Sequence, residues 1–531
     1  MATESPTPTR GGEDRGGAEA VARTARGGAL NMAAAVAGAG LNLALVVAVA
    51  RGFSQDTAGL LFAATSVFLI ASAVAQLGTA NGLVYFLART RALGSAGQTR
   101  RLLCTALVPV AAASLALGAA MAVFAGPVAE LAGEPGAAVY LRLLAAFLPF
   151  AAVTEALLAA TRAHHDMAAT AAVEKVGRPL GQVLLVLGAA AAGSAGLLAV
   201  AWAGPYLPAA VVAALWLRRV VRKAAAPEAA PPTSPKEPRE PPPAPVTPHE
   251  FWGFTLPRSV AQVAQIGNQR AGIVLVAAVQ GAAAAAVFTA GTRLLVAGQF
   301  ATQAVQFAAG PRLAEMLAVD DRAGTARLYR SATAWLICLT WPLFLPAVVY
   351  APLVMGLFGP GYAGAAGAGV LVVVAVAQMA SASLGMGDLL LTMAGRTGWN
   401  LANNLLSLAA NLVLCAVLIP PLGAVGAALA WAAAIGVRNL LPLVQLHRMI
   451  GVHPFSARWA AAAGAALVWF GAVPALCAAA LGATGPSLVL ALMVGGGGWA
   501  ATVWRMRTLL DLDGLLPKRW RRPTPEPAAT P

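Results

Sequence analysis

From Leu256 to Gly281 the sequence reads LPRSVAQVAQIGNQRAGIVLVAAVQG. A helix of this length spans about 39 Å, which exceeds the hydrocarbon core of a bilayer, about 30 Å. Its first fifteen residues nevertheless include two arginines, three glutamines and an asparagine. Each arginine near the middle of a membrane helix costs roughly 2.5 to 3.5 kcal/mol on insertion scales, so such residues persist where a polar interior shelters them. The stretch therefore predicts a membrane helix with a polar face directed into the protein.

The whole chain has the composition of an integral membrane protein. Of its 531 residues, 59% are hydrophobic and 11% are charged, whereas soluble domains carry about 25% charged residues. About fourteen apolar runs are long enough to cross a bilayer as helices, so we predict an all-α polytopic membrane protein. The predicted spans are 29–50, 58–86, 102–125, 138–161, 170–191, 195–217, 254–279, 284–308, 331–357, 364–393, 397–419, 422–446, 457–482 and 485–505.

A segment rich in proline and charge divides the predicted spans. Residues 223–248 read KAAAPEAAPPTSPKEPREPPPAPVTP, a composition that cannot build a core and favours an extended linker. It leaves two six-span halves and a two-span extension. We expect a disordered cytoplasmic tail (1–28), an N-terminal six-helix lobe (29–222), a cytoplasmic linker (223–249), a C-terminal six-helix lobe (250–447), two additional transmembrane helices (448–506) and a basic cytoplasmic tail (507–531).

Basic residues set the expected orientation. They gather in the even-numbered connections, such as Arg89 and Arg91 after the second span, and are sparse in the odd-numbered ones. By the positive-inside rule both termini are cytoplasmic, and we expect a bacterial plasma membrane. The net charge of +15 comes from these connections and the tails, so nucleic acid is not an expected partner. The cysteines have the spacing of neither a zinc site nor a disulfide framework, and we expect no metal or cofactor: Cys104, Cys338, Cys415 and Cys477.

The two halves resemble each other. GPVAELAGEPGAAVYLRLLAAF, from Gly126, has the pattern of APLVMGLFGPGYAGAAGAGVLV, from Ala351: a small residue and a proline, a loop ending in Pro-Gly, then a new span. GLLFAATSVFLIASAVAQLG, from Gly59, likewise parallels VFTAGTRLLVAGQFATQAVQ, from Val287. Because each half has an even number of spans, the repeats share one orientation and are related by an axis along the membrane normal. This architecture predicts a cavity between two lobes.

Polar residues recur at helical spacing in three spans of the second half. Arg258, Gln262, Gln265 and Gln269 follow the spacing i, i+4, i+7 and i+11, which places them on one helix face, and Arg270 lies beside it. Three such stripes would be costly against lipid, so we expect them to line a hydrated cavity. The other two stripes are Thr292, Gln299, Gln303 and Gln306, and Asn400, Asn404, Ser407 and Asn411.

The first half has fewer polar positions in its spans. Its clearest stripe is Glu174, Arg178 and Gln182 in the fifth span. Two other roles stay open for such residues: amides can hold membrane helices together, at about 0.6 kcal/mol each, and arginines near span ends can snorkel to the interface. Candidates for ion or proton coupling are Glu155, Glu174 and Asp388, although Glu174 could instead pair with a nearby arginine.

Two stretches carry a resemblance to a known family. LVVAVARGFSQDTAGLLFAATSVFLIASAVAQLGTANGLVYFLAR, from Leu45 to Arg89, has an Arg-Gly turn, a short polar loop and a Gly-rich, Tyr-containing end before a basic loop. It resembles the first two spans of bacterial polysaccharide (Wzx-type) flippases. NQRAGIVLVAAVQGAAAAAVFTAGTRLL, from Asn268, resembles their seventh and eighth spans. Here Ala271 and Gly272 replace the acidic residue that commonly follows the arginine in that family.

The resemblance implies the multidrug/oligosaccharidyl-lipid/polysaccharide exporter superfamily, in which two six-helix lobes face each other across a central cavity. Its lipid II flippases add two C-terminal helices, a place that spans 457–482 and 485–505 would occupy. It implies a flippase that moves an undecaprenyl-diphosphate-linked saccharide from the inner to the outer leaflet by alternating access, for cell-surface polysaccharide or cell-wall assembly. Membrane lipid and polysaccharide-assembly enzymes are the other expected partners.

The chemistry of that substrate selects the candidate binding residues. A diphosphate carries about two negative charges and needs fixed cations, and the arginine fork bonds two oxygens at once. Sugar hydroxyls need amide donors and acceptors. We expect Arg258 and Arg270 to bind the diphosphate, with Arg293 and Arg178 as further candidates. The residues expected to contact sugar hydroxyls are Gln262, Gln265, Gln299, Gln303, Asn400 and Asn404.

Two other functions stay open. A cation-coupled multidrug exporter would share the architecture, but such proteins often carry an intramembrane acid in the first span, where this chain has Asn31 and Asn42. A transport-inactive scaffold could recruit partners through its cytoplasmic tails, although the polar stripes would then have no role. An enzyme is not expected, because no sizeable external loop could hold a donor site. The drive is either the inside-negative membrane potential or proton or sodium antiport.

Overall fold

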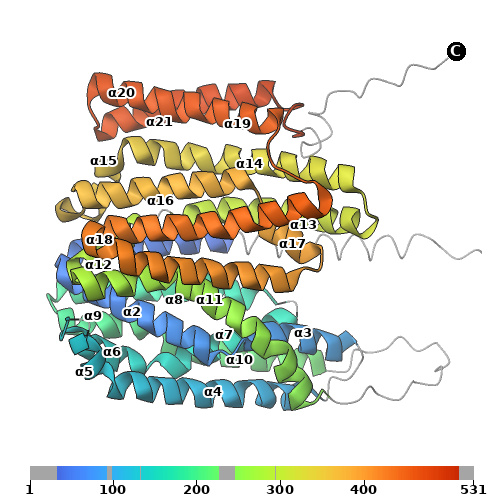
Figure 1. Cartoon of the computed structure of the whole chain (residues 1–531). Coiled ribbons are helices and arrows are strands. Elements are labelled where there is room, and N and C mark those ends of the chain that lie inside the picture. The colour runs from blue at the N-terminus through green and yellow to red at the C-terminus, as the bar shows by residue number, and fades with distance from the viewer. Residues whose placement is uncertain are drawn as a thin grey trace, which may run out of the picture. The chain divides into compact units, whose positions relative to one another are not determined.

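The computed structural model describes residues 33–92, 98–131, 133–164, 166–225, 246–293 and 295–512. This part of the chain is helical, with short turns and no strands (Figure 1). The expected N-terminal tail, residues 226–245 of the expected linker and residues 513–531 of the basic tail lie outside the described residues, as does Asn31.

The first half begins with a helix over Ala33–Gly52. The helices that follow it are α2 (Gln55–Ala75), α3 (Thr79–Ala92), α4 (Thr99–Val123), α5 (Ala125–Leu131), α6 (Ala137–Ala145), α7 (Leu148–Ala163), the π-helix η2 (Thr170–Gly177), α8 (Arg178–Ala191), α9 (Ala195–Ala203) and α10 (Tyr206–Ala225).

The second half begins with α11 (Pro248–Gln280). It continues with α12 (Ala282–Gly291), α13 (Leu295–Ala318), α14 (Arg322–Val349), α15 (Ala351–Met355), the 3₁₀ turns η3 (Gly356–Phe358) and η4 (Pro360–Tyr362), α16 (Ala365–Leu384), α17 (Gly387–Met393) and α18 (Thr397–Ile450). The C-terminal pair consists of α19 (Ala457–Ala466), the π-helix η5 (Leu467–Ala472), α20 (Val473–Leu481) and α21 (Gly485–Arg505).

The helices agree with the predicted spans. Each predicted range falls on one helix or on consecutive helical segments. Among the described residues, nine helices are long and apolar enough to cross a membrane, or ten if α6 and α7, which are bent by 46°, form one span. The predicted all-α polytopic membrane fold is therefore confirmed.

Several spans that look continuous in the sequence are broken in the structure. α2 and α3 are separated by a turn in which Leu77 and Gly78 have φ values of 50° and 69°. α16 ends at Gly385, with φ 83°. In α18, by contrast, the break was predicted: its 54 residues include Gly423 at φ 56°, so α18 comprises two helices, which correspond to the spans 397–419 and 422–446. These breaks use positive φ, which glycine adopts without steric cost.

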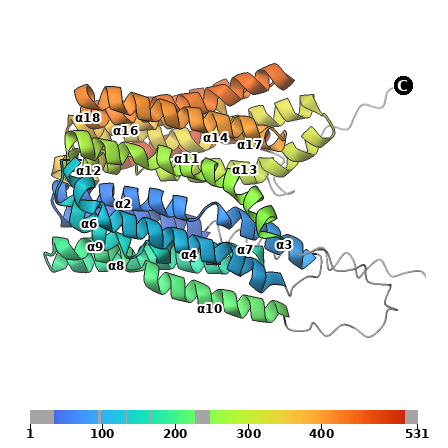
Figure 2. The ribbon, with the colours of Figure 1, turned by 60° about the horizontal axis from the view of Figure 1, so that its bottom comes forward.

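The chain forms two compact units. Unit 1 comprises Met1–Val49, Ala71–Ala125 and Leu141–Gln262. One of its buried clusters joins α3, α4, α7, α10 and the start of α11 around Phe86 and Phe251; Figure 2 shows α4, α7 and α10 running along one another.

Unit 2 comprises Ala50–Ile70, Gly126–Tyr140 and Val263–Pro531. Its core includes Tyr329 of α14 and Leu390 of α17, with α13, α16 and α18 packed around them. Tryptophans 341, 459 and 499 pack the C-terminal pair against α14. The division into two six-helix lobes stays a prediction.

The first helix packs closely on the π-helix η2 in unit 1. A Cβ atom added to Gly38 would lie 2.5 Å from the carbonyl oxygen of Lys175, whereas one added to Gly40 would meet nothing within 4 Å. Small residues let membrane helices approach each other closely. Gly38 therefore sets the distance between these two helices.

We expect Gly38→Ala to destabilise the protein by about 1 to 3 kcal/mol, because the new methyl group overlaps the backbone of η2. Gly40→Ala is the matched control, two residues away on the same helix, and should be neutral or slightly stabilising because alanine favours helix. Thermal unfolding in detergent measures both. Equal melting temperatures for the two variants would contradict the close approach.

Candidate functional site

Several glutamines of the two stripes in α11 and α13 are exposed. Gln265 of α11 and Gln299 and Gln303 of α13 all lie on the surface of unit 2. A polar group without a partner in hydrocarbon costs several kcal/mol. These side chains are therefore suited to a water-filled surface rather than to lipid. That they line a hydrated cavity stays a prediction.

Two arginines of unit 2 lie within electrostatic range of each other. Arg293, which follows α12, and Arg270, in the middle of α11, are both half-buried, and each charge acts on the other. Nε of Arg293 donates to the carbonyl oxygen of Thr289 at 3.1 Å. Two like charges repel more strongly as the local dielectric constant falls. An anion bound beside them would relieve this repulsion.

Arg258, unlike Arg270 and Arg293, is exposed and contacts a ring of its own helix. Its side chain is exposed, Nη1 donates to the carbonyl oxygen of Phe254 at 2.8 Å, and the guanidinium carbon lies 3.7 Å from the centroid of the Phe254 ring. It is thus folded back along its own helix by a cation–π contact. Gln262, one turn further on, donates to Oε1 of Gln76 at 3.3 Å.

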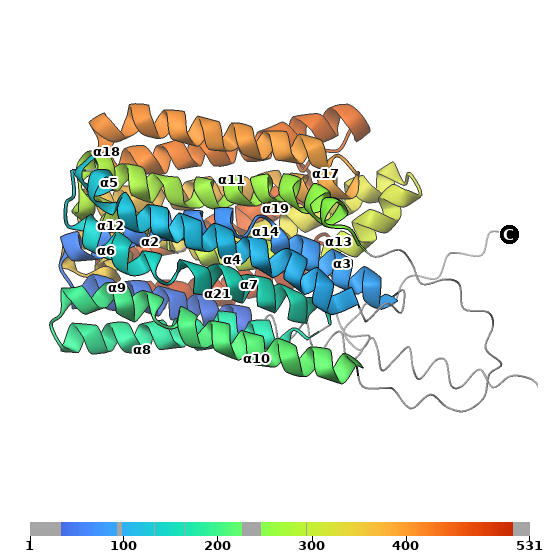
Figure 3. The ribbon, with the colours of Figure 1, turned by 90° about the horizontal axis from the view of Figure 1, so that it is seen from below.

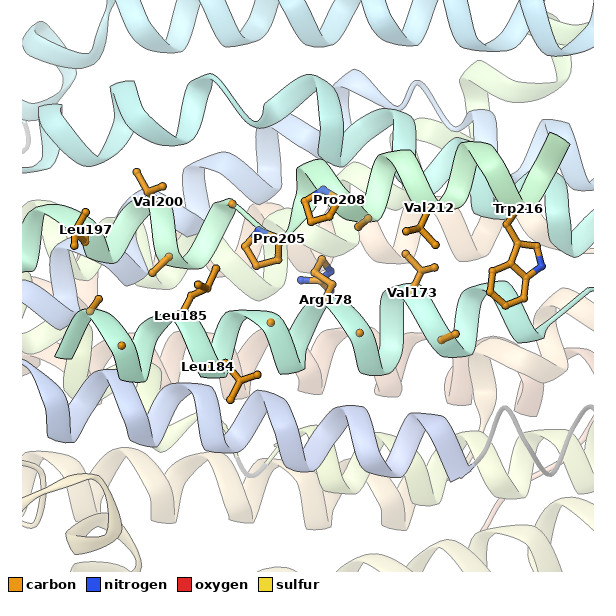
Figure 4. A pocket seen from close by; sticks show the side chains of 18 residues that line it. Val173, Arg178, Leu184, Leu185, Leu197, Val200, Pro205, Pro208, Val212 and Trp216 are labelled. Carbon is orange, nitrogen blue, oxygen red and sulfur yellow. The ribbon is translucent and has the colours of Figure 1, made fainter. Parts of the chain in front are cut away.

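Arg178 lies in an apolar groove of unit 1. The groove has a volume of about 770 Å³ and runs between η2–α8 and α9–α10; Figure 4 shows Arg178 midway along it, between Val173 and Leu185, and Figure 3 shows α8 beside α9 and α10. Nη1 donates to Gln182 and to the Tyr206 hydroxyl at 3.2 and 3.3 Å. Arg178 is the charged residue of an otherwise apolar lining.

Two of the three candidate coupling carboxylates form ion pairs that the sequence did not predict. Glu155 pairs with Arg162 at 2.9 Å, and Asp388 pairs with Arg438 at 3.0 Å. Glu174, on the π-helix η2, forms no ion pair within 4 Å in the described part of the chain, although Glu155, Arg162 and Arg178 all act on it electrostatically. The π-helix is a rare conformation that often occurs at functional sites.

The stripe of the eleventh span divides into two parts. Asn400 and Asn404 are half-buried, and Asn404 donates to Oδ1 of Asn400 at 3.0 Å. Deeper in α18, Ser407 and Asn411 are fully buried. Asn411 donates to Oδ1 of Asn268 in α11 at 2.8 Å. The expectation that the whole stripe lines a cavity is wrong for Ser407 and Asn411, because these two side chains join α11 to α18.

Neither a known sequence family nor a curated protein matches the chain, but its fold matches solved membrane transporters. The lipid II flippase MurJ in an inward closed conformation superposes with a TM-score of 0.68 at 12% identity, over 91% of this chain and 99% of that chain. An inward-facing multidrug resistance MATE family transporter of the MOP superfamily superposes with a TM-score of 0.57 at 16% identity. This match covers 77% of this chain and 94% of that chain.

A MOP superfamily transporter from Pyrococcus furiosus gives a TM-score of 0.51 at 16% identity, over 81% of this chain and 95% of that chain. The chain thus shares a polytopic membrane fold with these proteins, whose names describe a flippase and transporters. Two of them are described as members of the MOP superfamily, the superfamily that the sequence resemblance implied.

We expect Asn411→Ala to lower the stability of the folded protein by about 1 to 2 kcal/mol, because a buried interhelical hydrogen bond is lost and Asn268 loses a partner. Asn404→Ala is the control, since Asn404 bonds only within α18 among the described residues. Its effect should be smaller. Unfolding of both variants in detergent, followed by melting temperature, tests the assignment, which fails if Asn404→Ala is the more damaging change.

Proposed function

We propose that the chain is a flippase that moves an undecaprenyl-diphosphate-linked saccharide from the inner to the outer leaflet of the bacterial plasma membrane by alternating access, with both termini cytoplasmic. The observation that carries this proposal is the half-buried pair Arg270 and Arg293 in the unit that also exposes Gln265, Gln299 and Gln303. A lipid diphosphate and its saccharide require this combination.

The arginine pair is suited to the diphosphate. Two guanidinium groups can provide parallel hydrogen bonds to several phosphate oxygens, and the bound charge offsets their mutual repulsion. The exposed glutamines offer both donors and acceptors to sugar hydroxyls. A neutral or cationic drug would not be attracted by these two positive charges.

The fold matches differ in extent. The match to the lipid II flippase covers 91% of this chain, and the match to the MATE transporter covers 77%. At 12% identity the likeness concerns the fold alone, so the substrate rests on the side-chain chemistry.

The groove of unit 1 suits a different part of such a substrate. Its lining is apolar apart from Arg178, so it has few partners for sugar hydroxyls and is chemically compatible with a hydrocarbon chain. Arg178 is already held by Gln182 and Tyr206. We therefore assign Arg178 a lesser role in binding the diphosphate than Arg270 and Arg293.

A cation-coupled multidrug exporter is the second candidate, and the acids of unit 1 are the observation that favours it. Glu155 and Glu174 lie within electrostatic range of each other. Against it, the described first helix, Ala33–Gly52, contains no carboxylate. Its polar residue Asn42 donates to the Gly38 carbonyl of its own helix at 2.8 Å.

We expect Arg270→Ala and Arg293→Ala each to reduce flipping of a fluorescent undecaprenyl-diphosphate oligosaccharide in proteoliposomes by more than about tenfold, because one charge-assisted contact to the diphosphate is lost. Arg327→Ala, at an exposed arginine near the start of α14, should flip normally. Unchanged flipping by both test variants would contradict the proposed anion site, and drug efflux without flipping by the wild type would favour the multidrug exporter.

The membrane potential should drive the reaction without a coupling ion. An inside-negative potential favours outward movement of an anion by about 2.3 kcal/mol per charge per 100 mV, so collapsing it with valinomycin and potassium should slow flipping. Glu155→Gln and Glu174→Gln, which remove carboxylate charges, should keep this dependence. If flipping instead requires a proton or sodium gradient and stops in Glu174→Gln, antiport is the drive.

A further inference from the structure

Two contacts within unit 2 connect segments that are far apart in the sequence. In the first, Arg51, at the end of the first helix, reaches the turn after α15. Its Nε donates to the carbonyl oxygen of Leu357 at 2.7 Å, and Nη2 donates to that of Gly356 at 3.2 Å. These carbonyl groups lie at the C-terminal end of a helical segment, where the helix dipole favours a cation.

In the second contact an acidic side chain meets the N-terminal end of a helix, whereas in the first a basic side chain meets a C-terminal end. Oε1 of Glu134, in the loop between α5 and α6, accepts a hydrogen bond from the backbone N–H of Ala282 at 2.7 Å. Ala282 is the first residue of α12, and Gly281 before it provides no side-chain cap. A carboxylate at a helix N-terminus satisfies a free N–H group and is favoured by the dipole.

The two contacts are related by the internal repeat. The loops that begin at Gly126 and Ala351 are equivalent in the repeat; the first carries Glu134 and the second carries the carbonyl groups of Gly356 and Leu357. Arg51 follows the first span of one repeat, and Ala282 follows the first span of the other. Each repeat thus uses the turn after its first span to hold the equivalent loop of the other repeat.

From this reciprocal arrangement we infer that Arg51 and Glu134 form a two-point clasp that holds the outer end of the transporter closed. The inference rests on the proposed alternating-access function. Arg51, Glu134 and Ala282 lie in odd-numbered connections, and Gly356 and Leu357 lie at the end of span 331–357, beside another; charge asymmetry predicts these connections to be outside.

Close backbone packing lies directly beneath the clasp. A Cβ atom on Gly59 of α2 would overlap the carbonyl group of Ala282, so α2 and α12 touch without an intervening side chain. Gln55, near the start of α2, packs against Gly361 of η4, where an added Cβ would lie 2.7 Å from Nε2. To admit water from outside, the α2 segment must move away from α12, and the clasp must break.

A buried reporter on α2 can detect this opening. Ser66 is fully buried and lies seven residues after Gly59, hence on the same helix face. In a background with Cys104, Cys338, Cys415 and Cys477 replaced by alanine, Ser66→Cys provides a single thiol. The rate of its reaction with an externally added, membrane-impermeant maleimide measures how often the outer end opens.

We expect Glu134→Ala and Arg51→Ala each to increase the labelling rate of Ser66→Cys about tenfold, the effect of losing one charge-assisted hydrogen bond. Gly59→Ala should increase it as well, by forcing α2 from α12. Glu134→Gln keeps an acceptor oxygen and should have a smaller effect. Glu130→Ala is the matched control, because Glu130 is an exposed acid of α5 near the same loop, and it should label like the parent.

The clasp would be overturned if Glu134→Ala and Arg51→Ala label no faster than the parent protein or than the control Glu130→Ala. Arg51→Leu and Glu134→Leu, which can make neither contact, provide the same comparison if an alanine variant does not reach the membrane. Flipping is measured separately in proteoliposomes. If Glu134→Ala and Arg51→Ala label faster but the parent protein does not flip the oligosaccharide, the clasp is supported and the proposed substrate is not. The two ideas can therefore fail independently.

Discussion

The bilayer interior offers no water to polar groups, and the rest of this structure depends on that constraint. The backbone satisfies it by forming helices throughout the described residues. Polar side chains satisfy it in one of two ways. Some are paired inside the protein, as Asn411 is with Asn268 and Glu155 with Arg162. Others, such as Gln265 and Gln299, are exposed and require a hydrated surface.

This division separates residues that maintain the fold from residues available to a substrate. Asn411 and Arg258 belong to stripes that look alike in sequence, yet the first is buried between helices and the second is folded back on Phe254. Arg270 and Arg293 differ from both because their charges repel each other. A bound anion would be attracted by both charges.

The internal repeat adds a second level of organisation. The sequence repeat predicts two equivalent turns and two equivalent loops, and Arg51 and Glu134 contact a loop and a turn of the other predicted repeat. This exchange explains why residues 50–70 and 126–140 of the first half belong to the same compact unit as the second half. The two contacts use opposite ends of helix dipoles, so they need no buried ion pair and remain easy to reverse.

The sequence by itself determined the class of fold, the spans and their repeat, because hydropathy over about 20 residues is a local property that decides membrane insertion. It also located the polar positions. Only the tertiary structure decided the partners of these positions: Arg162 for Glu155, Arg438 for Asp388 and Asn268 for Asn411. Asn268 and Asn411 are 143 residues apart. Helical periodicity shows which residues share a face, but only packing determines whether that face meets another helix, lipid or water.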